Sequence, residues 1–517
     1  MIQRKSSKKI VLFLPHRADP GRGEMFSADL LPLELLQIAS GPVAEGYEVV
    51  MIDAMVEPDY ERKVIEACED ALLFASSCIL GYQVYDGYKV AKMVREKLPS
   101  LPIIWGGWFP SVIPEMYLEH DIADAVGIGQ GELTFLDVVK AVESGEDLAT
   151  VPGLVVKREG RIVYTDHRAV EGFDAFKPVP WDLLDFEKYA ELQVKPTRMK
   201  VRHRFPLPGH WTPSNPPRGF SFFSSFGCPE PCTFCCSPLI TGRRWKAIPG
   251  RQLAEEIAEL QQRFKFDVLR FQDANFGVAE KRTKEFCEAL VDLQVPIHWN
   301  GTIEIETIMR YKEETLDLLE ESKCHLLWLG AETGTKEMQE RIKKFIDIDH
   351  IPEAIGKLAK RNIVPGTFWI IGYPGETRES MEETLKRAAA VKYAYPIAGS
   401  EVYPFRPIPG TEDFGAAVKL GYEPPKDFAE WGDCFEYKYN SQNTPIPADI
   451  RETWTRYNNT AAIYDQYVQE GPLWMRKLLS KMAGWRLKKG SYDLPIEQKL
   501  FDLYVRATGQ TQPAAAD

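Results

Sequence analysis

Three cysteines within one short run form the most chemically specific pattern in the chain. Cys228, Cys232 and Cys235 follow the spacing CxxxCxxC. Thiolates at this spacing can hold three corners of a cubane iron–sulfur cluster, which leaves the fourth iron free to bind a substrate or cofactor. A structural zinc ion is the alternative, and it normally takes four protein ligands. Cys236 is the nearest further thiol, but adjacent residues rarely point at one small ion, so the pattern favours the iron–sulfur cluster.

The sequence around these cysteines resembles the radical S-adenosylmethionine (SAM) superfamily. Residues 220–226 predict a buried strand that runs into the cysteine loop, and Phe234 stands where the family carries an aromatic residue. The resemblance implies a [4Fe–4S] cluster on the three cysteines, with SAM chelated by the open iron. It also implies that an electron from the cluster cleaves the sulfonium to give a 5′-deoxyadenosyl radical, while the protein positions these cofactors.

Length and composition fit a large enzyme. The chain has 517 residues, 44% of them apolar, which predicts two or three domains with sizeable cores. The net charge of −12 argues against nucleic-acid binding. No apolar run is long enough to span a bilayer or to form a signal-peptide core. Nine irregularly spaced cysteines do not form a disulfide framework, so we expect a reducing, cytoplasmic setting.

The first 145 residues alternate strand and helix patterns. The expected strands are residues 10–15, 47–53, 71–76, 102–107 and 125–129. Such alternation predicts an α/β, doubly wound, Rossmann-like parallel sheet, whose ligands bind at the carboxyl ends of the strands. Small residues gather at those ends, and they are Ser76, Ser77, Gly81, Gly106, Gly107, Gly127, Gly129 and Gly131.

In this order, and ahead of the cysteine motif, these loops resemble the cobalamin-binding domain of class B radical SAM enzymes over residues 8–145. The resemblance implies that the loops surround the corrin and its nucleotide tail. The implied contact residues are Ser76, Ser77, Gly106, Gly107, Trp108, Gly129, Gln130, Gly131 and Glu132. Trp108 departs from the family, where histidine often follows the glycine pair. Tyr82 and Gln83 either lie under the corrin or serve as helix-capping and packing residues.

No histidine is predicted to bind cobalt. The Asp-x-His-x-x-Gly frame of the methionine-synthase type is absent, and His16 and His120 both lie outside such a frame. A second interpretation is a Rossmann unit that has lost its ligand. NAD binding is not expected, because the glycine-rich phosphate loop is missing after the first strand.

Residues 219–415 resemble the partial (β/α)6 barrel of the radical SAM superfamily. Residues 268–276 stand at the Phe-x-Asp-Asp-x-Phe strand end, residues 329–335 resemble Gly-x-Glu-Ser-Gly, and residues 368–376 resemble the strand that lines the adenine. The implied SAM contacts are Phe234, Gln272, Asp273, Ala274, Glu332, Thr333, Ile371 and Gly372. Glu332 is the candidate for the ribose hydroxyls, since a carboxylate accepts two hydrogen bonds well.

Three charged residues of the barrel allow more than one interpretation. Glu304 either holds a cationic or hydroxylated substrate group or pairs with a neighbouring arginine. Lys343 and Lys344 either approach the SAM carboxylate or lie on a solvated helix face.

The chain divides into a cobalamin-binding domain (1–145), a linker with a hairpin (146–218), the barrel (219–415) and a mainly helical C-terminal region (416–517). In the last region, one apolar stripe is predicted at helical spacing. Its residues are Trp474, Met475, Leu478, Leu479, Met482 and Trp485, with lysines and arginines mostly off the stripe. The stripe either packs against the barrel or lies on an anionic membrane surface.

The motifs together predict a cobalamin-dependent radical SAM enzyme. Methyl transfer from methylcobalamin to an unactivated carbon is the chemistry that the resemblance implies first. Cyclisation, oxidation or rearrangement with the same cofactors is the alternative, and a non-enzymatic corrinoid or iron–sulfur protein is a third hypothesis that leaves the SAM-type motifs unexplained. We expect a small-molecule or lipid-like substrate and an external electron donor such as flavodoxin or ferredoxin.

Overall fold

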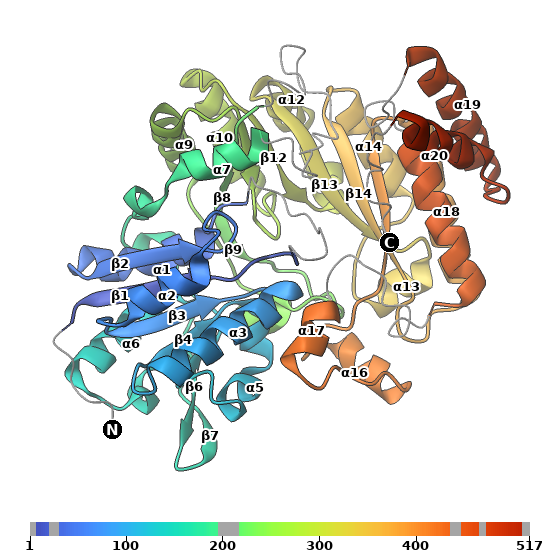
Figure 1. The fold of residues 1–517 in the computed structure, drawn as a ribbon. Helices are drawn as coiled ribbons and strands as arrows, with labels where there is room; N and C mark the ends of the chain where they lie inside the picture. Colours follow the sequence, from blue (N-terminus) through green and yellow to red (C-terminus); the bar gives the residue numbers. More distant parts are fainter. Residues whose placement is uncertain (1–6, 20–29, 195–216, 435–445, 465–471, 509–517) are drawn as a thin grey trace.

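The computed structural model describes residues 7–19, 30–194, 217–434, 446–464 and 472–508. Two β-sheets whose strands are mainly parallel, one after the other along the chain, organise the molecule (Figure 1). The helices that follow the second sheet lie against its outer strand and against the first domain.

The first sheet has the strand order β2-β1-β3-β4-β5-β6-β7. Its parallel strands are β1 (Lys9–Leu14), β2 (Glu48–Asp53), β3 (Leu73–Ser77), β4 (Ile103–Gly106) and β5 (Ala125–Gly127). Helices α1 (Leu33–Ala44) and α6 (Glu132–Ser144) supply apolar residues to the core on one face, and α2 (Tyr60–Cys68), α3 (Tyr82–Lys97) and α5 (Pro114–Glu119) to the core on the other. Because both faces are covered, β3 is buried throughout. The predicted doubly wound fold is confirmed.

A hairpin extends this sheet beyond residue 145. Strands β6 (Leu154–Arg158) and β7 (Arg161–Tyr164) form the expected hairpin, but β6 pairs antiparallel with β5 and so joins the first sheet. Leu154, Val155 and Val156 are buried, and this apolar run explains why the hairpin packs on the sheet. The segment that we expected as a linker therefore contributes two strands to the first domain, followed by α7 (Phe186–Val194).

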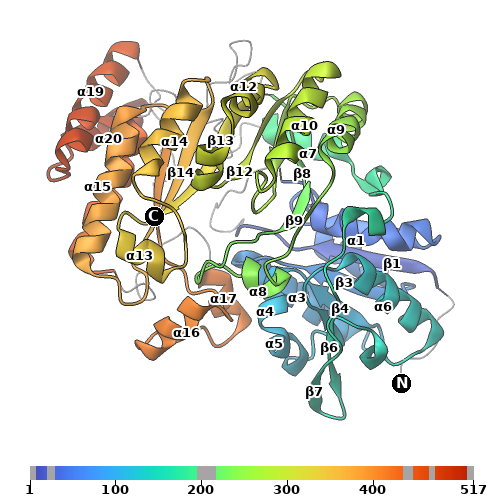
Figure 2. The same cartoon turned by 180° about the vertical axis from the view of Figure 1, so that it is seen from behind.

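The second sheet is a partial barrel of six parallel strands in the order β15-β14-β13-β12-β11-β8. The strands are β8 (Gly219–Phe222), β11 (Val268–Phe271), β12 (His298–Ile303), β13 (Cys324–Glu332), β14 (Val364–Ile371) and β15 (Gly399–Pro404). The intervening helices are α9 (Gly250–Phe264), α10 (Glu280–Asp292), α11 (Ile305–Arg310), α12 (Glu313–Glu321), α13 (Lys336–Arg341), α14 (His350–Ala359) and α15 (Arg378–Ala394). Figure 2 shows this helical layer from behind. The expected (β/α)6 architecture is confirmed.

The strand expected at residues 220–226 is two strands. After β8, the strand pairing is interrupted at Ser224. The N–H of Ser224 donates to the carboxylate of Asp273 at 2.8 Å instead of to a neighbouring strand. The chain then forms β9 (Ser225–Gly227), which pairs antiparallel with β10 (Trp245–Ala247). A side-chain acceptor thus ends the strand, a feature that the run of apolar residues did not reveal.

The C-terminal helices lie in two places. Helices α16 (Glu412–Lys419) and α17 (Phe428–Cys434) return to the first domain, where Phe428 stacks on Tyr88 of α3 with ring centroids 4.5 Å apart. Helices α18 (Ala448–Tyr464), α19 (Leu473–Lys489) and α20 (Ile496–Thr508) lie beside the barrel (Figure 1). Trp454 of α18 donates its indole N–H to the carbonyl of Val402 in β15 at 2.7 Å.

Hydrogen bonds join the first domain to β8 of the barrel and to α7, which packs in the barrel core. The N–H of Leu31, just before α1, donates to Ser221 Oγ of β8 at 2.9 Å. The hydroxyl of Tyr189 in α7 donates to Asp53 at the end of β2 at 2.8 Å, and both groups are buried. These contacts fix the carboxyl ends of the first sheet relative to the barrel.

Candidate functional site

The cysteine loop begins where β9 ends. Gly227 has φ +84°, and a Cβ at this position would overlap the carbonyl oxygen of Arg244 in the loop before β10. Only glycine adopts this backbone without strain and leaves room for the neighbouring chain. The loop then carries Cys228, Cys232 and Cys235 into the short helix α8 (Ser237–Thr241).

The three thiols suit a cluster better than a single ion. All nine cysteines are free. In the described part of the chain, no three His, Cys, Asp or Glu side chains converge as they would around one metal ion. A cubane takes each cysteine on a different iron, so its sulfurs need not converge on one point. Burial raises the pKa of all three thiols, to about 11 for Cys228, and a bound cluster would supply the positive charge that holds them as thiolates.

Nearby charges separate these three thiols from Cys236. Burial is the main cause of the raised pKa at each of the four. Lys344 and Glu304 also act on the pKa of Cys228, Cys232 and Cys235, whereas neither acts on that of Cys236. The three thiols are therefore within the electrostatic influence of one cation and one carboxylate, and the thiol of Cys236 is not.

The loop is held in place by residues from α13 and α16. Thr233 donates its hydroxyl to Asp413 Oδ2 at 2.8 Å and its N–H to the carbonyl of Ile342 at 3.0 Å. Arg341 donates to the other oxygen of Asp413 at 2.9 Å. Phe234 lies edge-on to Tyr373, with ring centroids 5.6 Å apart. The cysteine loop is thus fixed by the barrel before any cofactor binds.

A buried lysine between two glutamates lies beside the cysteines. Lys344, 4% exposed, places Nζ 2.6 Å from Glu304 Oε2 and 3.6 Å from Glu332 Oε1. Two expectations need correction: Glu304 pairs with a lysine and not with an arginine, and Lys344 does not lie on a solvated face. Lys343, by contrast, is exposed and pairs with Glu412 at 2.6 Å.

Two carboxylates share this one ammonium group. Burial alone would lower the pKa of Lys344, but Glu304 and Glu332 raise it above its usual value, so the lysine stays charged. Burial raises the pKa of Glu332 to about 7, with Lys344 opposing this and Glu304 adding to it. Glu332 therefore changes charge near neutral pH.

The backbone places Glu332 in a strained position. It has φ +61°, and the pairing of β13 with β14 shifts register between Gly330 and Glu332. A Cβ on Gly330 would overlap Glu332 Oε1 and would lie 3.0 Å from Lys344 Nζ. The bulge and the glycine together aim this carboxylate at the lysine.

The end of β14 offers a polar group that the protein leaves unsatisfied. The N–H groups of Gly372 and Tyr373, which follow Ile371, donate to Glu376 Oε2 at 2.7 and 3.1 Å. The hydroxyl of Tyr373 is buried and has no hydrogen-bond partner among the described residues. Gln272 Nε2, at the end of β11, is buried in the same unsatisfied state. Buried polar groups normally find partners, so both fit a site that a polar ligand completes.

Other predicted SAM residues lie at the same strand ends with different surroundings. The Asp273 carboxylate accepts hydrogen bonds from Ser224 and Ser225, so its side chain is used within the protein. Ala274 is exposed, and Thr333 is buried with its hydroxyl 3.3 Å from that of Thr384. The structure brings all of these residues to the carboxyl ends of β11, β13 and β14; their contacts with SAM stay predictions.

The loops predicted for cobalamin lie at the ends of three adjacent strands. Ser77 ends β3, Gly107 follows β4 and Gly129 follows β5, and these strands are neighbours in the sheet. Gly107 has φ +95°, and its Cβ would lie 2.5 Å from the carbonyl oxygen of Cys78, so glycine is required there. A Cβ on Gly106 would meet nothing within 4 Å. Backbone at Gly106 therefore borders open space at the carboxyl end of β4.

Several polar side chains in these loops already have internal partners. Ser76 donates to the carbonyl of Phe13 at 3.0 Å. The Gln83 carboxamide accepts from Ile79 N at 2.8 Å, and that of Gln130 accepts from Glu171 N at 2.8 Å. These contacts match the packing interpretation for Gln83. Tyr82 is half-buried next to Tyr85, and Trp108 begins the short helix α4 (Trp108–Val112).

Burial shifts the pKa of two titratable groups near the predicted cobalamin loops, Glu132 and His16. Glu132 follows Gly131 at the start of α6, and burial raises its pKa to about 7. His16 follows β1; its N–H donates to Asp86 Oδ2 at 2.8 Å, and burial lowers the pKa of its imidazole. His120 is exposed and faces the ring of Tyr88 edge-on.

The two candidate cofactor sites meet at α8. This helix begins two residues after Cys235 and contacts α4 of the first domain, as Figure 2 shows. A Cβ on Gly129 would lie 3.4 Å from the carbonyl oxygen of Ile240 in α8. The loop after β5 therefore touches the segment that carries the cysteines, and the two sites border the same space.

Sequence reasoning missed the residues that support the site. They are Tyr373, Glu376, Asp413 and Arg282. Arg282 donates to the carbonyls of Ile248, Phe276 and Ser224, which surround the Asp273 loop. Asp413 and Arg282 act on partners far away in the chain, so no local spacing marks them. For Tyr373, the signal was an aromatic residue within the adenine-strand motif.

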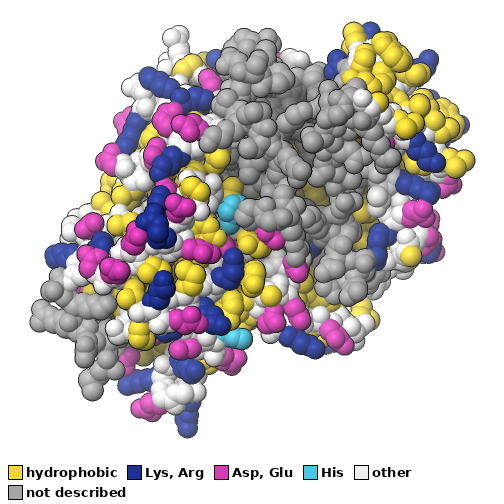
Figure 3. Space-filling view, viewed as in Figure 1, with side chains coloured by type: hydrophobic (Ala, Val, Ile, Leu, Met, Phe, Trp, Pro, Cys, Tyr) yellow, Lys and Arg dark blue, Asp and Glu magenta, His cyan; other side chains and the backbone are white. Residues whose placement is uncertain are grey.

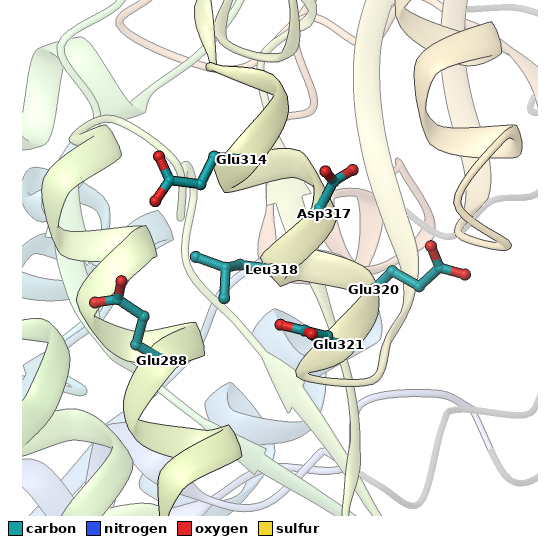
Figure 4. Close-up of a pocket in the computed structure, with 6 residues that line it drawn as sticks. All are labelled: Glu288, Glu314, Asp317, Leu318, Glu320 and Glu321. Atoms are coloured by element: carbon teal, nitrogen blue, oxygen red, sulfur yellow. The ribbon is translucent and has the colours of Figure 1, made fainter.

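An acidic hollow lies elsewhere, between α10 and α12 (Figure 4). It is lined by Glu288, Glu314, Asp317, Leu318, Glu320 and Glu321. Glu314 bonds to Lys284, Asp317 to Arg361 and Glu320 to Asn362. The hollow lies between two outer helices and not at a strand end, so it is not part of the candidate site.

Two family models match the chain, the radical SAM superfamily over residues 223–388 and the B12 binding domain over residues 24–139. An uncharacterized methyltransferase of Pyrococcus horikoshii is 27% identical over 393 residues, which cover 75% of this chain and 78% of that protein. An anaerobic magnesium-protoporphyrin IX monomethyl ester cyclase of Synechocystis is 25% identical over 390 residues, which cover 73% of this chain and 71% of that protein.

Solved structures share the whole architecture. The cobalamin-dependent SAM radical enzyme OxsB, with aqua-cobalamin bound, superposes with a TM-score of 0.69 at 15% identity, over 98% of this chain and 76% of that one. At this identity, the likeness establishes a common fold.

Proposed function

Because the chain belongs to the cobalamin-dependent (class B) radical SAM superfamily, we propose that it transfers a methyl group from SAM to an unactivated carbon of a small-molecule substrate. The observation that carries the proposal is the contact at α8, where the loop after β5 touches the segment bearing the cysteines. Two cofactors held at these edges border one reaction space, which gives the proximity that such a transfer requires. The likeness to the Pyrococcus horikoshii methyltransferase supports the same outcome.

The enzyme uses a [4Fe–4S] cluster, SAM and cobalamin. When bound, these groups supply a 5′-deoxyadenosyl radical and a transferable methyl group. Cys228, Cys232 and Cys235 hold the cluster in this proposal, and Cys236 does not. Lys344 acts electrostatically on these three thiols and not on that of Cys236, and this difference supports the choice.

The buried Lys344 orients SAM in this proposal. A carboxylate ligand suits its ammonium group, which is the cation beside the cysteine thiols. Glu332 accepts the ribose hydroxyls, and Glu304 keeps Lys344 charged. The free hydroxyl of Tyr373 and the free Nε2 of Gln272 provide two further polar contacts. Phe234 and Ile371 give the apolar walls for the adenosine.

Cobalamin lies along the carboxyl ends of β3, β4 and β5 in this proposal. Gly106 and Gly107 allow the ring to approach the backbone, and Glu132 offers a polar group at the start of α6. No histidine binds cobalt. Electron paramagnetic resonance of bound cob(II)alamin checks this last point, because an axial nitrogen would split the signal.

Ring closure without methyl transfer is the second candidate function. Its support is the 25% identity with the magnesium-protoporphyrin IX monomethyl ester cyclase. The arrangement of the cysteines, Lys344 and the glycine loops serves radical formation in either reaction, so the fate of the methyl group decides between the two.

We also infer an external reductant and a cytoplasmic setting. Reducing the cluster needs an electron that no side chain here supplies, and a flavodoxin or ferredoxin fits this need. Nine free cysteines match a reducing compartment. The net charge of −12 argues against a nucleic-acid substrate.

Methyl-labelled SAM tests the proposal. The protein is reconstituted anaerobically with iron, sulfide and cobalamin, reduced, and incubated with SAM that carries a deuterated methyl group. We expect mass spectrometry to find the label on protein-bound cobalamin, and then on the product once a substrate is added. Unlabelled cobalamin alongside steady 5′-deoxyadenosine release would contradict methyl transfer and favour the second candidate.

A further inference from the structure

Helices α19 and α20 carry an exposed apolar surface. Of the 17 large apolar side chains that are exposed in the described part of the chain, eight fall between residues 473 and 503. These eight residues define the α19–α20 face, and they are Leu473, Trp474, Leu478, Trp485, Leu494, Ile496, Leu500 and Leu503. Figure 3 shows an apolar area over these two helices at the upper right. Single exposed apolar residues are common, but a concentrated group usually marks an interaction site.

The spacing of these residues gives each helix an outward stripe. On α19, Trp474, Leu478 and Trp485 recur at helical spacing with exposures of 69%, 48% and 57%. On α20, Ile496, Leu500 and Leu503 recur at i, i+4 and i+7. These residues therefore fall on one side of each helix, and the exposed Lys481 lies among those of α19.

The inner side of α19 has its own apolar contacts. Met475, Leu479 and Ala483 are buried against Ile463 of α18. The predicted single stripe is thus wrong in detail, because Met475 and Leu479 face the core while Trp474, Leu478 and Trp485 face outward. A core helix explains the first set and leaves the second unexplained.

The charge of this region is opposite to that of the whole protein. Residues 472–508 contain eight lysines and arginines against three acidic residues, in a chain whose net charge is −12. All three acids have partners: Glu497 is buried against Arg486, Asp493 pairs with Arg456, and Asp502 accepts a hydrogen bond from Gln498. Lys477, Lys481 and Lys488 are exposed on α19. The apolar face therefore has a basic border.

We propose that the α19–α20 face docks on an anionic lipid surface. Its apolar side chains would enter the boundary between headgroups and acyl chains, and its lysines would meet lipid phosphates and carboxylates. Trp474 and Trp485 suit this boundary because indole is apolar with one polar N–H. None of the described helices is long and apolar enough to cross a membrane, so the contact lies along the surface.

Charge distinguishes a lipid surface from a second copy of the chain. A symmetric dimer through this face would bring two basic borders together, and like charges at an interface are unfavourable. An anionic bilayer offers the opposite charge. The lipid interpretation is therefore the one that both the apolar stripes and the lysines support.

Vesicle co-sedimentation tests the proposal with the full-length holoenzyme. We expect binding to vesicles of phosphatidylcholine mixed with phosphatidylserine at low salt, weaker binding at high salt, and little binding to phosphatidylcholine alone. Replacing both exposed tryptophans (Trp474→Ser with Trp485→Ser) should lower binding to the mixed vesicles by at least about ten-fold.

Matched variants separate docking from general effects of charge and folding. Lys477→Glu with Lys481→Glu should also weaken binding, whereas Lys92→Glu with Lys281→Glu reverses exposed charges on α3 and α10 and should leave it unchanged. Leu420→Ser removes an apolar side chain that is 68% exposed on another surface and should have no effect. Circular dichroism and iron content confirm that each variant is folded.

Three results would overturn the proposal. The first is no binding to the mixed vesicles at low salt, and the second is equal binding to neutral vesicles that salt does not weaken. The third is a stable dimer in sedimentation velocity that the tryptophan changes dissociate, since the face would then join two copies of the chain. Each of these outcomes leaves the proposed methyl transfer intact, because the labelled-SAM experiment uses no lipid.

Discussion

The two sheet edges that border the proposed reaction space differ in construction. The cluster side, at the ends of the barrel strands, consists of the cysteine loop and the buried charges of Lys344, Glu304 and Glu332. The cobalamin side, at the ends of β3, β4 and β5, consists mainly of glycine backbone, and polar side chains such as Gln83 and Gln130 are bonded within the protein. One edge is made of reactive side chains and the other of open backbone.

This difference follows from the ligands. SAM is small and carries an amine, a carboxylate and hydroxyls, so charged and polar side chains can recognise it. A corrin is large and broad, and it needs backbone that a side chain would obstruct. Removing charged side chains should therefore weaken cluster and SAM binding on the cluster side. Adding side-chain atoms to the glycines should weaken cobalamin binding on the cobalamin side.

The largest effect is expected at the cysteines. Replacing Cys228, Cys232 or Cys235 by Ala should abolish the cluster, because three thiolates are the minimum that holds three irons of a cubane. Cys236→Ala is the matched control, since Cys236 lies outside the space that Lys344 and Glu304 influence. Iron and sulfide per chain are measured after anaerobic reconstitution. Equal loss of iron in Cys236→Ala and Cys232→Ala would show that the ligand assignment is wrong.

The buried charges should give the next largest effect. Lys344→Met leaves Glu304 and Glu332 without their shared cation, and breaking a buried pair in this way costs about 3–5 kcal/mol. Lys343→Met is the neighbouring control, because its pair with Glu412 is exposed and should matter little. Urea unfolding of the apoprotein compares the two variants, and SAM binding to the reconstituted protein should fall only in the first. Equal behaviour of the two would remove Lys344 from the site.

Glu132 should make stability depend on pH on the cobalamin side. Its pKa is about 7 in the folded protein against 4.5 ordinarily, because burial disfavours the carboxylate. Between these values, the folded state keeps a proton that the unfolded chain releases, so stability falls as pH rises through this window. Glu132→Gln removes this loss and should be more stable than the natural protein by about 3 kcal/mol above pH 7, with no difference below pH 4.5.

Urea unfolding of the apoprotein across pH measures this effect. Glu146→Gln changes an exposed glutamate near the end of the same helix and is the control. A Glu132→Gln advantage that is constant across pH would mean that the carboxyl group does not titrate as described.

The glycine pair should give the smallest effects and separate folding from binding. Gly107→Ala should destabilise the apoprotein by about 1–3 kcal/mol, because φ is +95° and the new Cβ meets the carbonyl oxygen of Cys78. Gly106→Ala should leave the apoprotein intact, since nothing lies within 4 Å of the new methyl group. We nevertheless expect it to weaken cobalamin binding, measured by absorbance titration. Unchanged cobalamin affinity in a folded Gly106→Ala protein would move the corrin away from this loop.

The sequence predicted the strands, and the position of the cysteine and glycine loops at strand ends, for a physical reason. Cysteine spacing, strand–helix alternation and glycine pairs are local patterns, and local geometry produces them. The break at Ser224 was not predictable, because the acceptor that causes it, Asp273, lies 49 residues away. The same holds for Lys344, whose burial depends on Glu304 and Glu332 from two other segments. The division of the predicted α19 stripe into a buried and an exposed side was not predictable, because the residues on both sides are apolar.

The central claim is that one chain holds the cluster and SAM at the barrel edge and cobalamin at the edge of the first sheet. Cleavage of SAM by the cobalamin-loaded protein tests this claim most directly. The protein is reconstituted anaerobically with iron, sulfide and cobalamin, reduced, and mixed with SAM, and 5′-deoxyadenosine is measured by mass spectrometry. We expect the natural protein to release 5′-deoxyadenosine while it retains cobalamin. We expect the Cys232→Ala protein to retain cobalamin but to release no 5′-deoxyadenosine. If the loaded protein binds both cofactors and leaves SAM intact, or if Cys232→Ala cleaves SAM as the natural protein does, the cluster side does not do the chemistry assigned to it.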